Sequence, residues 1–89
     1  MEGKEEKAFE AFCHRVGRRV KSLRKERGWT QEYMAELGFS TRRYQRIEAG
    51  NPITLRTAYR LARAFEIGVE ELFQGTTGSA QTTRRKRRL

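Results

Sequence analysis

Apolar residues recur at helical spacing in five stretches of the chain, and none alternates apolar with polar residues as a strand would. The longest stretch, residues 5–27, contains no proline and only one glycine. On a helical wheel its apolar side chains fall on one stripe: Phe9, Phe12, Cys13, Val16, Val20 and Leu23. The pattern predicts a long first helix with a single buried face.

Capping and helix-ending residues divide the next part of the chain. Gly28 ends the first helix, and Thr30 is a suitable N-cap for a second. Gly38 can take the positive φ of a tight turn, Ser40 caps a third helix, and Gly50 closes it. Three residues of the second helix are expected to face the core: Met34, Ala35 and Leu37.

A turn at Asn51 and Pro52 precedes two further helices. Thr54 caps the fourth, on which four apolar residues form one face: Leu55, Ala58, Ala62 and Phe65. A short fifth helix is expected around Ile67, Leu72 and Phe73. Residues 75–89 have almost nothing to bury and carry the basic run Arg84–Arg88, so they are expected to form a disordered basic tail. The sequence predicts an all-α, five-helix domain over residues 1–74.

The third helix has two chemically different sides. Tyr44 and Ile47 fall on one side, and three long polar residues fall on the other: Arg42, Gln45 and Arg46. Arginine can bond bidentately to guanine, and glutamine to adenine, in the major groove of DNA. The layout is that of a DNA-reading helix-turn-helix, in which residues 30–50 hold two short helices hinged at Gly38.

Charge strengthens this reading. The net charge is +9 and the isoelectric point about 10.6, which favours a nucleic-acid partner. Residues 11–63 carry thirteen basic and four acidic side chains, whereas residues 1–10 carry two basic and four acidic ones. The predicted reading helix therefore lies in the basic part of the chain.

Other functional classes find little support. The chain has no Asp, one His and one Cys, so an enzyme, a metal site or a bound cofactor is not expected. Cys13 has no second cysteine to pair with, and His14 beside it has no further ligand at metal spacing. No signal peptide or membrane-spanning run is seen and no small-molecule ligand is evident, so a cytoplasmic protein is expected.

The order of landmarks resembles that of the phage-repressor-like, or lambda-repressor-like (XRE), helix-turn-helix family over residues 16–73. The match rests on the run GRRVKSLR, the pair Thr30-Gln31, the helix-turn-helix residues and the closing Glu-Leu-Phe. These landmarks are Gly17, Arg24, Ala35, Gly38, Ser40, Ile47, Glu48, Gly50 and Phe73. The resemblance implies that helices 2 and 3 form the helix-turn-helix and that the third enters the major groove.

The resemblance also implies roles for individual residues. Gln31 would bond a phosphate and brace a side chain of the third helix, and Arg24 would form a partly buried ion pair with Glu48. The expected base-reading residues are Thr41, Arg42, Gln45 and Arg46. The expected phosphate-binding residues are Gln31, Ser40, Arg43, Asn51 and Arg56, although the Gly50 to Leu55 connection is one residue shorter than the family's. Tyr44 replaces the family's Ile or Val, so its hydroxyl needs water, a side chain or a phosphate as a partner.

The expected function is that of a bacterial or phage transcription regulator, associated with the nucleoid, which binds double-stranded DNA as a homodimer on a pseudo-palindrome. Two surfaces are candidates for the dimer contact: the fifth helix with Phe73, and Phe9 with Phe12 on the first helix. The alternative is a protein-interaction adaptor or an antitoxin, and an adaptor would need an exposed apolar patch elsewhere. RNA binding is less favoured because no aromatic stacking platform is evident. The Arg84–Arg88 run is either a solubilising tail, a sequence-independent phosphate contact or an address signal.

Overall fold

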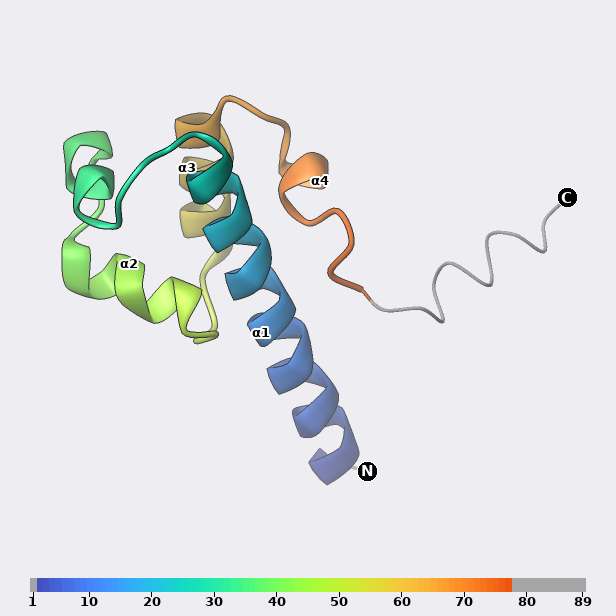
Figure 1. Ribbon diagram of the computed structural model, residues 1–89. Helices are drawn as coiled ribbons and strands as arrows, with labels where there is room; N and C mark the ends of the chain where they lie inside the picture. The colour runs from blue at the N-terminus through green and yellow to red at the C-terminus, as the bar shows by residue number, and fades with distance from the viewer. Residues whose placement is uncertain (1, 78–89) are drawn as a thin grey trace, which may run out of the picture.

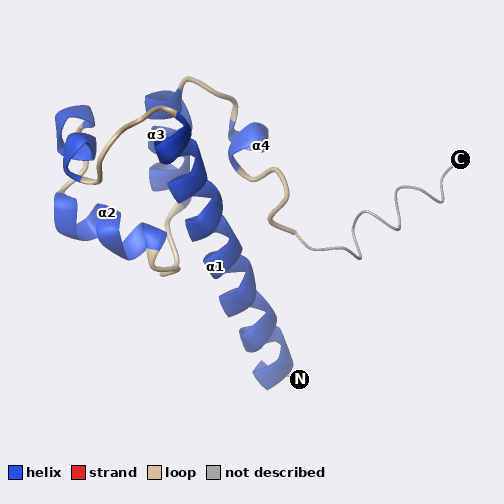
Figure 2. Cartoon of the chain, in the orientation of Figure 1, coloured by secondary structure: helices blue, strands red, loops and turns tan. Residues whose placement is uncertain are grey.

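The computed structural model describes residues 2–77, which form helices joined by loops (Figure 1; Figure 2). Five helices follow one another: α1 (Glu2–Glu26), the 3-10 helix η1 (Glu32–Leu37), α2 (Thr41–Glu48), α3 (Leu55–Phe65) and α4 (Val69–Leu72). The predicted all-α, five-helix architecture is confirmed. The rest of the predicted tail, including Arg84–Arg88, lies outside the described residues.

One core joins the helices. The stripe of α1 supplies Val16, Val20 and Leu23, and α3 supplies Leu61 and Phe65, all of them buried. The remaining buried core residues are Met34, Phe39, Tyr44, Ile47, Ala58, Ala62 and Leu72. Helix α1 therefore serves as the support against which the shorter helices pack.

The stripe of α1 is not buried along its whole length, as the sequence suggested. The N-terminal part of α1 projects beyond the other helices (Figure 1), and Phe9 is 46% exposed. Helix α3 shows a similar difference, because Leu55 shares the face of Ala58 but is 81% exposed at the start of the helix. Wheel position alone predicts the face of a residue and not whether another element covers it.

The second helix differs from the expected α-helix in its winding. Its N-cap residue is Gln31 and not the predicted Thr30, but the Oγ1 of Thr30 accepts the backbone N–H of Tyr33 in the first turn at 3.0 Å. Its six residues end at Gly38, whose φ is 96°. A 3-10 helix has three residues per turn, so residues three positions apart share a face. That period places Met34 and Leu37 on one face and leaves Ala35 exposed, so the prediction that Ala35 faces the core is wrong.

The C-terminal segment is held to α1 by two arginines. Arg19 donates a hydrogen bond to the carbonyl of Glu71 at 2.7 Å, and Arg15 donates to the carbonyl of Thr76. Thr76 is only 1% exposed and its hydroxyl donates to the carbonyl of Phe73 at 2.7 Å. These contacts extend beyond residue 74, where the composition suggested that the domain ends.

Candidate nucleic-acid interface

The turn between η1 and α2 is fixed from both sides. Ser40 is the N-cap of α2, and its Oγ accepts the backbone N–H of Arg43 at 3.1 Å. On the other side Arg60 of α3 donates a hydrogen bond to the carbonyl of Gly38 at 2.6 Å. The same guanidinium lies 4.6 Å from the ring centroid of Phe39, within range of a cation–π interaction. The start of α2 is therefore held in one orientation relative to α3.

The inner face of α2 packs against α1 at very short range. Tyr44 and Ile47 are buried, at 0% and 7% exposure. Gly17 of α1 allows the close approach, because a Cβ at that position would lie 2.7 Å from the carbonyl oxygen of Ile47 and 2.8 Å from that of Glu48. Only glycine permits the C-terminal end of α2 to touch the α1 backbone in this way.

Glu48, the last residue of α2, accepts hydrogen bonds from three side chains. Arg24 of α1 donates two hydrogen bonds, from Nε at 2.6 Å and from Nη2 at 3.1 Å. Gln31 donates from Nε2 at 2.9 Å, and the hydroxyl of Tyr44 supplies the third donor. The remaining Arg24 nitrogen donates to the carbonyl of Trp29 at 2.8 Å. The ion pair implied by the resemblance is present, and a side chain of α2 itself satisfies the Tyr44 hydroxyl.

These contacts fix the protonation states of the cluster. Burial favours the neutral acid of Glu48, but the donated hydrogen bonds and the charge of Arg24 outweigh it and lower its pKa. Burial raises the pKa of Tyr44, and the bond from its hydroxyl to the Glu48 carboxylate raises it further. The hydrogen bond to Glu48 also raises the pKa of Arg24. At neutral pH the cluster therefore holds one carboxylate, one guanidinium and one neutral phenol.

Gln31 connects this buried cluster to the surface of α2. While its Nε2 donates to Glu48, its Oε1 faces the Nε2 of Gln45 at 3.4 Å, a long hydrogen bond. Gln45 thereby has one of its two amide hydrogens directed toward Gln31. Its second amide hydrogen and its Oε1 have no hydrogen-bond partner within residues 2–77.

The outer face of α2 carries exposed polar groups. Arg42, Gln45 and Arg46 are exposed, and Thr41 is half-buried at the first turn. No side-chain hydrogen bond or ion pair within the described part of the chain involves the guanidinium of Arg42 or of Arg46. The structure thus presents all four expected base-reading residues on or beside one solvent-facing side of α2.

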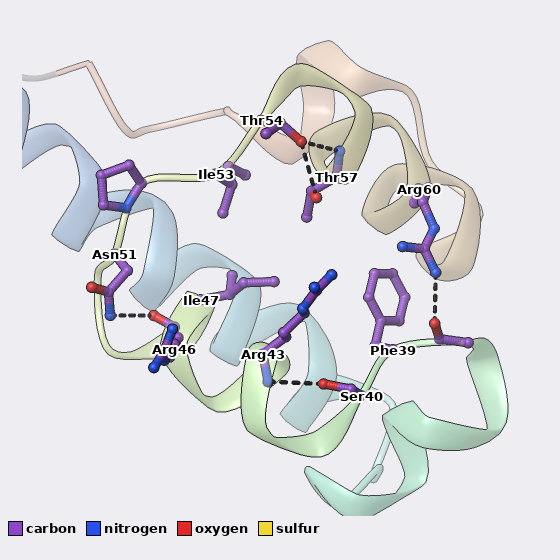
Figure 3. A pocket seen from close by; sticks show the side chains of 12 residues that line it. Phe39, Ser40, Arg43, Arg46, Ile47, Asn51, Ile53, Thr54, Thr57 and Arg60 are labelled. Atoms are coloured by element: carbon purple, nitrogen blue, oxygen red, sulfur yellow. Dashed lines mark hydrogen bonds between the residues drawn. The ribbon is translucent and has the colours of Figure 1, made fainter.

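A cationic hollow of about 530 Å³ separates α2 from α3 (Figure 3). Arg43 extends from α2 across it toward α3, Arg46 lies at its rim, and Arg60 borders it from α3. The other lining residues supply an apolar floor and several polar groups: Gly38, Phe39, Ser40, Ile47, Asn51, Pro52, Ile53, Thr54 and Thr57. Three guanidinium groups and two threonines make the hollow suited to an anion.

The remaining expected phosphate-binding residues are placed less favourably. Asn51 closes the end of α2, since its Nδ2 donates to the carbonyl of Arg46 at 3.0 Å. Arg56 is exposed on the first turn of α3 and does not line the hollow. Arg60 does line it, although its position in the sequence predicts no site role. The long-range contact of Arg60 with Phe39 and Gly38 leaves no local signal in the sequence.

Among residues 2–77, no three His, Cys or acidic side chains gather to hold a metal ion. Burial raises the pKa of the Cys13 thiol, and nearby Glu10 raises it further, so the thiol stays protonated. Within the same range, no helix combines the length and apolar character needed to cross a membrane.

Comparison with known proteins agrees with this arrangement. The family profile described as "Helix-turn-helix" matches residues 20–72, which include η1, the turn and α2. No match was found among curated proteins or among solved structures. The matched residues cover well over half of the chain and include the buried cluster and the outer face of α2. The chain therefore belongs to the XRE-type, lambda-repressor-like helix-turn-helix family of DNA-binding proteins.

Proposed function

We propose that this protein is a sequence-specific transcription regulator that inserts α2 into the major groove of double-stranded DNA. One observation carries the proposal: the inner face of α2 is fully engaged with the fold, whereas the outer-face arginines Arg42 and Arg46 have no acceptor among residues 2–77. A basic helix surface of this kind matches the acceptor-rich edge of guanine. The family membership supports DNA binding in general, and the base contacts are our extension of it.

The side chains of the outer face define what α2 would read. Arg42 and Arg46 would each bond to O6 and N7 of a guanine, and Thr41 would contact a base at the start of the helix. Gln45, oriented by Gln31, keeps one amide hydrogen and its Oε1 without a partner among residues 2–77. Those two groups match N7 and the N6 amino group of adenine. Gln31 thus acts as a positioning residue for base reading.

Phosphate contacts would lie on the two flanks of α2. Gln31 stands on the η1 flank, while Ser40 and Arg43 stand beside the hollow on the α3 flank. An inserted helix has a phosphate backbone on each side, so each flank would meet one strand. Asn51 and Arg56 remain proposed phosphate contacts, with Asn51 limited by its bond to the Arg46 carbonyl.

One copy of α2 covers only a few base pairs, so we propose a homodimer on a pseudo-palindromic operator in a bacterial or phage cytoplasm. Half-sites about 34 Å apart, one helical turn, would suit such a dimer. A protein-binding role, as an adaptor or antitoxin, is the second candidate. One observation favours it: an apolar groove between α1 and α3 is exposed.

Selection from a random pool of double-stranded DNA tests the proposal. We expect an enriched inverted repeat at about 0.15 M salt, with affinity falling steeply as salt rises. Absence of any enriched sequence would contradict DNA reading and favour the protein-binding role.

A comparison of two variants tests whether Gln31 positions Gln45 for base reading. Gln31→Ala should weaken binding to all sequences and also blur the preference opposite Gln45, whereas Arg63→Ala, on an exposed α3 position, should change neither. An unchanged affinity and base preference for Gln31→Ala would contradict the role of Gln31.

A further inference from the structure

The projecting part of α1 carries an apolar surface that the rest of residues 2–77 leaves uncovered. Phe9 is 46% exposed, and the half-buried Phe12 stacks on Phe73 with ring centroids 6.1 Å apart. Leu55, 81% exposed, stands at the opposite rim. Together they border a groove of about 160 Å³ whose remaining lining is Cys13, Val16, Asn51, Ile53, Thr54 and Ala58. This groove lies apart from the outer face of α2.

Charge changes sign along α1 at this groove. Residues 3–10 carry Lys4 and Lys7 together with three glutamates, and residues 15–21 carry four basic side chains and no acidic one. A parallel pair of α1 helices would place the acidic ends together and the basic stretches together. An antiparallel pair would place each acidic end beside the basic stretch of the other copy.

We infer that the groove binds a second copy of this chain, with the two α1 helices packed antiparallel across their projecting parts. In an antiparallel pair, the number of a residue and the number of the partner residue that faces it always add up to the same value. Phe9 of one copy therefore lies beside Phe12 of the other. Each copy then inserts Phe9 toward the partner's groove, and Glu6 approaches the partner's Arg15. This deepens the proposed function, because it gives the proposed homodimer its surface and orientation.

The position of α2 is compatible with a dimer that spans two half-sites. Gly17 marks where α1 touches α2, and it lies roughly 10 Å along α1 from the proposed two-fold axis near residues 10 and 11. With helices packed about 8–10 Å apart, the centre of each α2 lies within roughly 20 Å of that axis. A separation near one turn of DNA is therefore within reach.

The test is the oligomeric state of the full chain without DNA, measured by sedimentation equilibrium. The wild-type chain should form a concentration-dependent dimer, and Leu55→Glu or Phe9→Glu should raise its dissociation constant about tenfold or more. Glutamate is tolerated at both positions, since Leu55 begins α3 and Phe9 is exposed in a helix. Tyr59→Glu, on an α3 position 54% exposed and outside the groove, is the matched control.

Charge reversal tests the orientation. Replacing Glu5 and Glu6 by lysine should weaken an antiparallel dimer severalfold, because lysines would then face the partner's basic stretch. A parallel dimer would change little, because like charges would face one another before and after the replacement. A wild-type chain that stays monomeric, or a dimer unaffected by Leu55→Glu and Phe9→Glu, would overturn the inference. So would a dimer that the charge reversal leaves unchanged or strengthens.

DNA binding distinguishes this inference from the proposed function. A monomeric Leu55→Glu variant should keep the half-site base preference of the wild-type chain while losing affinity for the full operator. The Leu55→Glu and Phe9→Glu variants could lose the dimer as expected while the wild-type chain selects no DNA sequence. That result would support the α1 pairing and overturn the proposed function alone.

Discussion

The two faces of α2 are built for opposite purposes. On the inner face Tyr44 is fully buried and Glu48 accepts three side-chain donors, so every polar group has a partner inside the fold. On the outer face the guanidinium groups of Arg42 and Arg46 have no partner within residues 2–77. The contrast indicates that stability and recognition reside in different residues of one eight-residue helix, and that substitutions should separate them.

The largest effect is expected at the buried cluster. Glu48→Ala would leave the Arg24 guanidinium buried without its counter-ion, and loss of one partner of a buried pair costs about 3–5 kcal/mol. Urea unfolding followed by circular dichroism would measure the loss. Glu36→Ala, on an exposed position of η1, should change the free energy of unfolding by less than about 0.5 kcal/mol. Similar losses for the two variants would remove the distinction between buried and exposed carboxylates.

The second-largest loss of stability is expected at the contact between Gly17 and α2. Gly17→Ala forces a methyl group onto two carbonyl oxygens of α2, and the resulting shift should cost about 1–3 kcal/mol despite the better helix propensity of alanine. Gly3→Ala is the matched control, because no atom lies within 4 Å of its added Cβ. Unfolding curves should show Gly17→Ala destabilised and Gly3→Ala unchanged or slightly stabilised. Equal behaviour would show that α2 does not depend on this close approach.

A smaller loss is expected from Tyr44→Phe, which removes one donor to Glu48 and keeps the ring. Because the acceptor is charged, loss of this hydrogen bond should lower the free energy of unfolding by about 1–2 kcal/mol. The ring alone would account for the stability if the variant unfolded at the wild-type urea concentration.

The lowered pKa of Glu48 makes part of this stability depend on pH. The contribution is complete above the ordinary glutamate pKa of 4.5 and is lost as the pH falls through the lower value in the folded state. Wild-type stability should therefore drop as the pH falls below about 4.5, and Glu48→Gln should show a shallower drop. Parallel profiles for the two proteins would contradict the assignment of a charged Glu48.

Local signals explain how much of the fold could be predicted. Ser40 and Thr54 fixed the starts of α2 and α3, because a hydroxyl that caps a helix acts on residues three positions away. The two sides of α2 followed from its 100° periodicity. The family landmarks supplied the Arg24 to Glu48 pair, which periodicity alone could not.

Contacts between distant segments account for what the sequence did not reveal. The 3-10 winding of η1 has no local signal in the sequence, and it turned Ala35 outward. Arg60 reaches the Gly38 carbonyl 22 residues away, so its place beside the hollow required the packing of α3. The exposure of Phe9 likewise depends on where the other helices end.

The most direct test of the division between the faces is the DNA preference of Arg42→Ala, measured together with its stability. We predict that the variant unfolds like the wild-type chain, within about 0.5 kcal/mol, and loses about 1–3 kcal/mol of discrimination at a single base pair of the selected site. An unchanged base preference would contradict the assignment of the outer face as the reading surface. A large loss of stability would contradict the claim that this face contributes nothing to the fold.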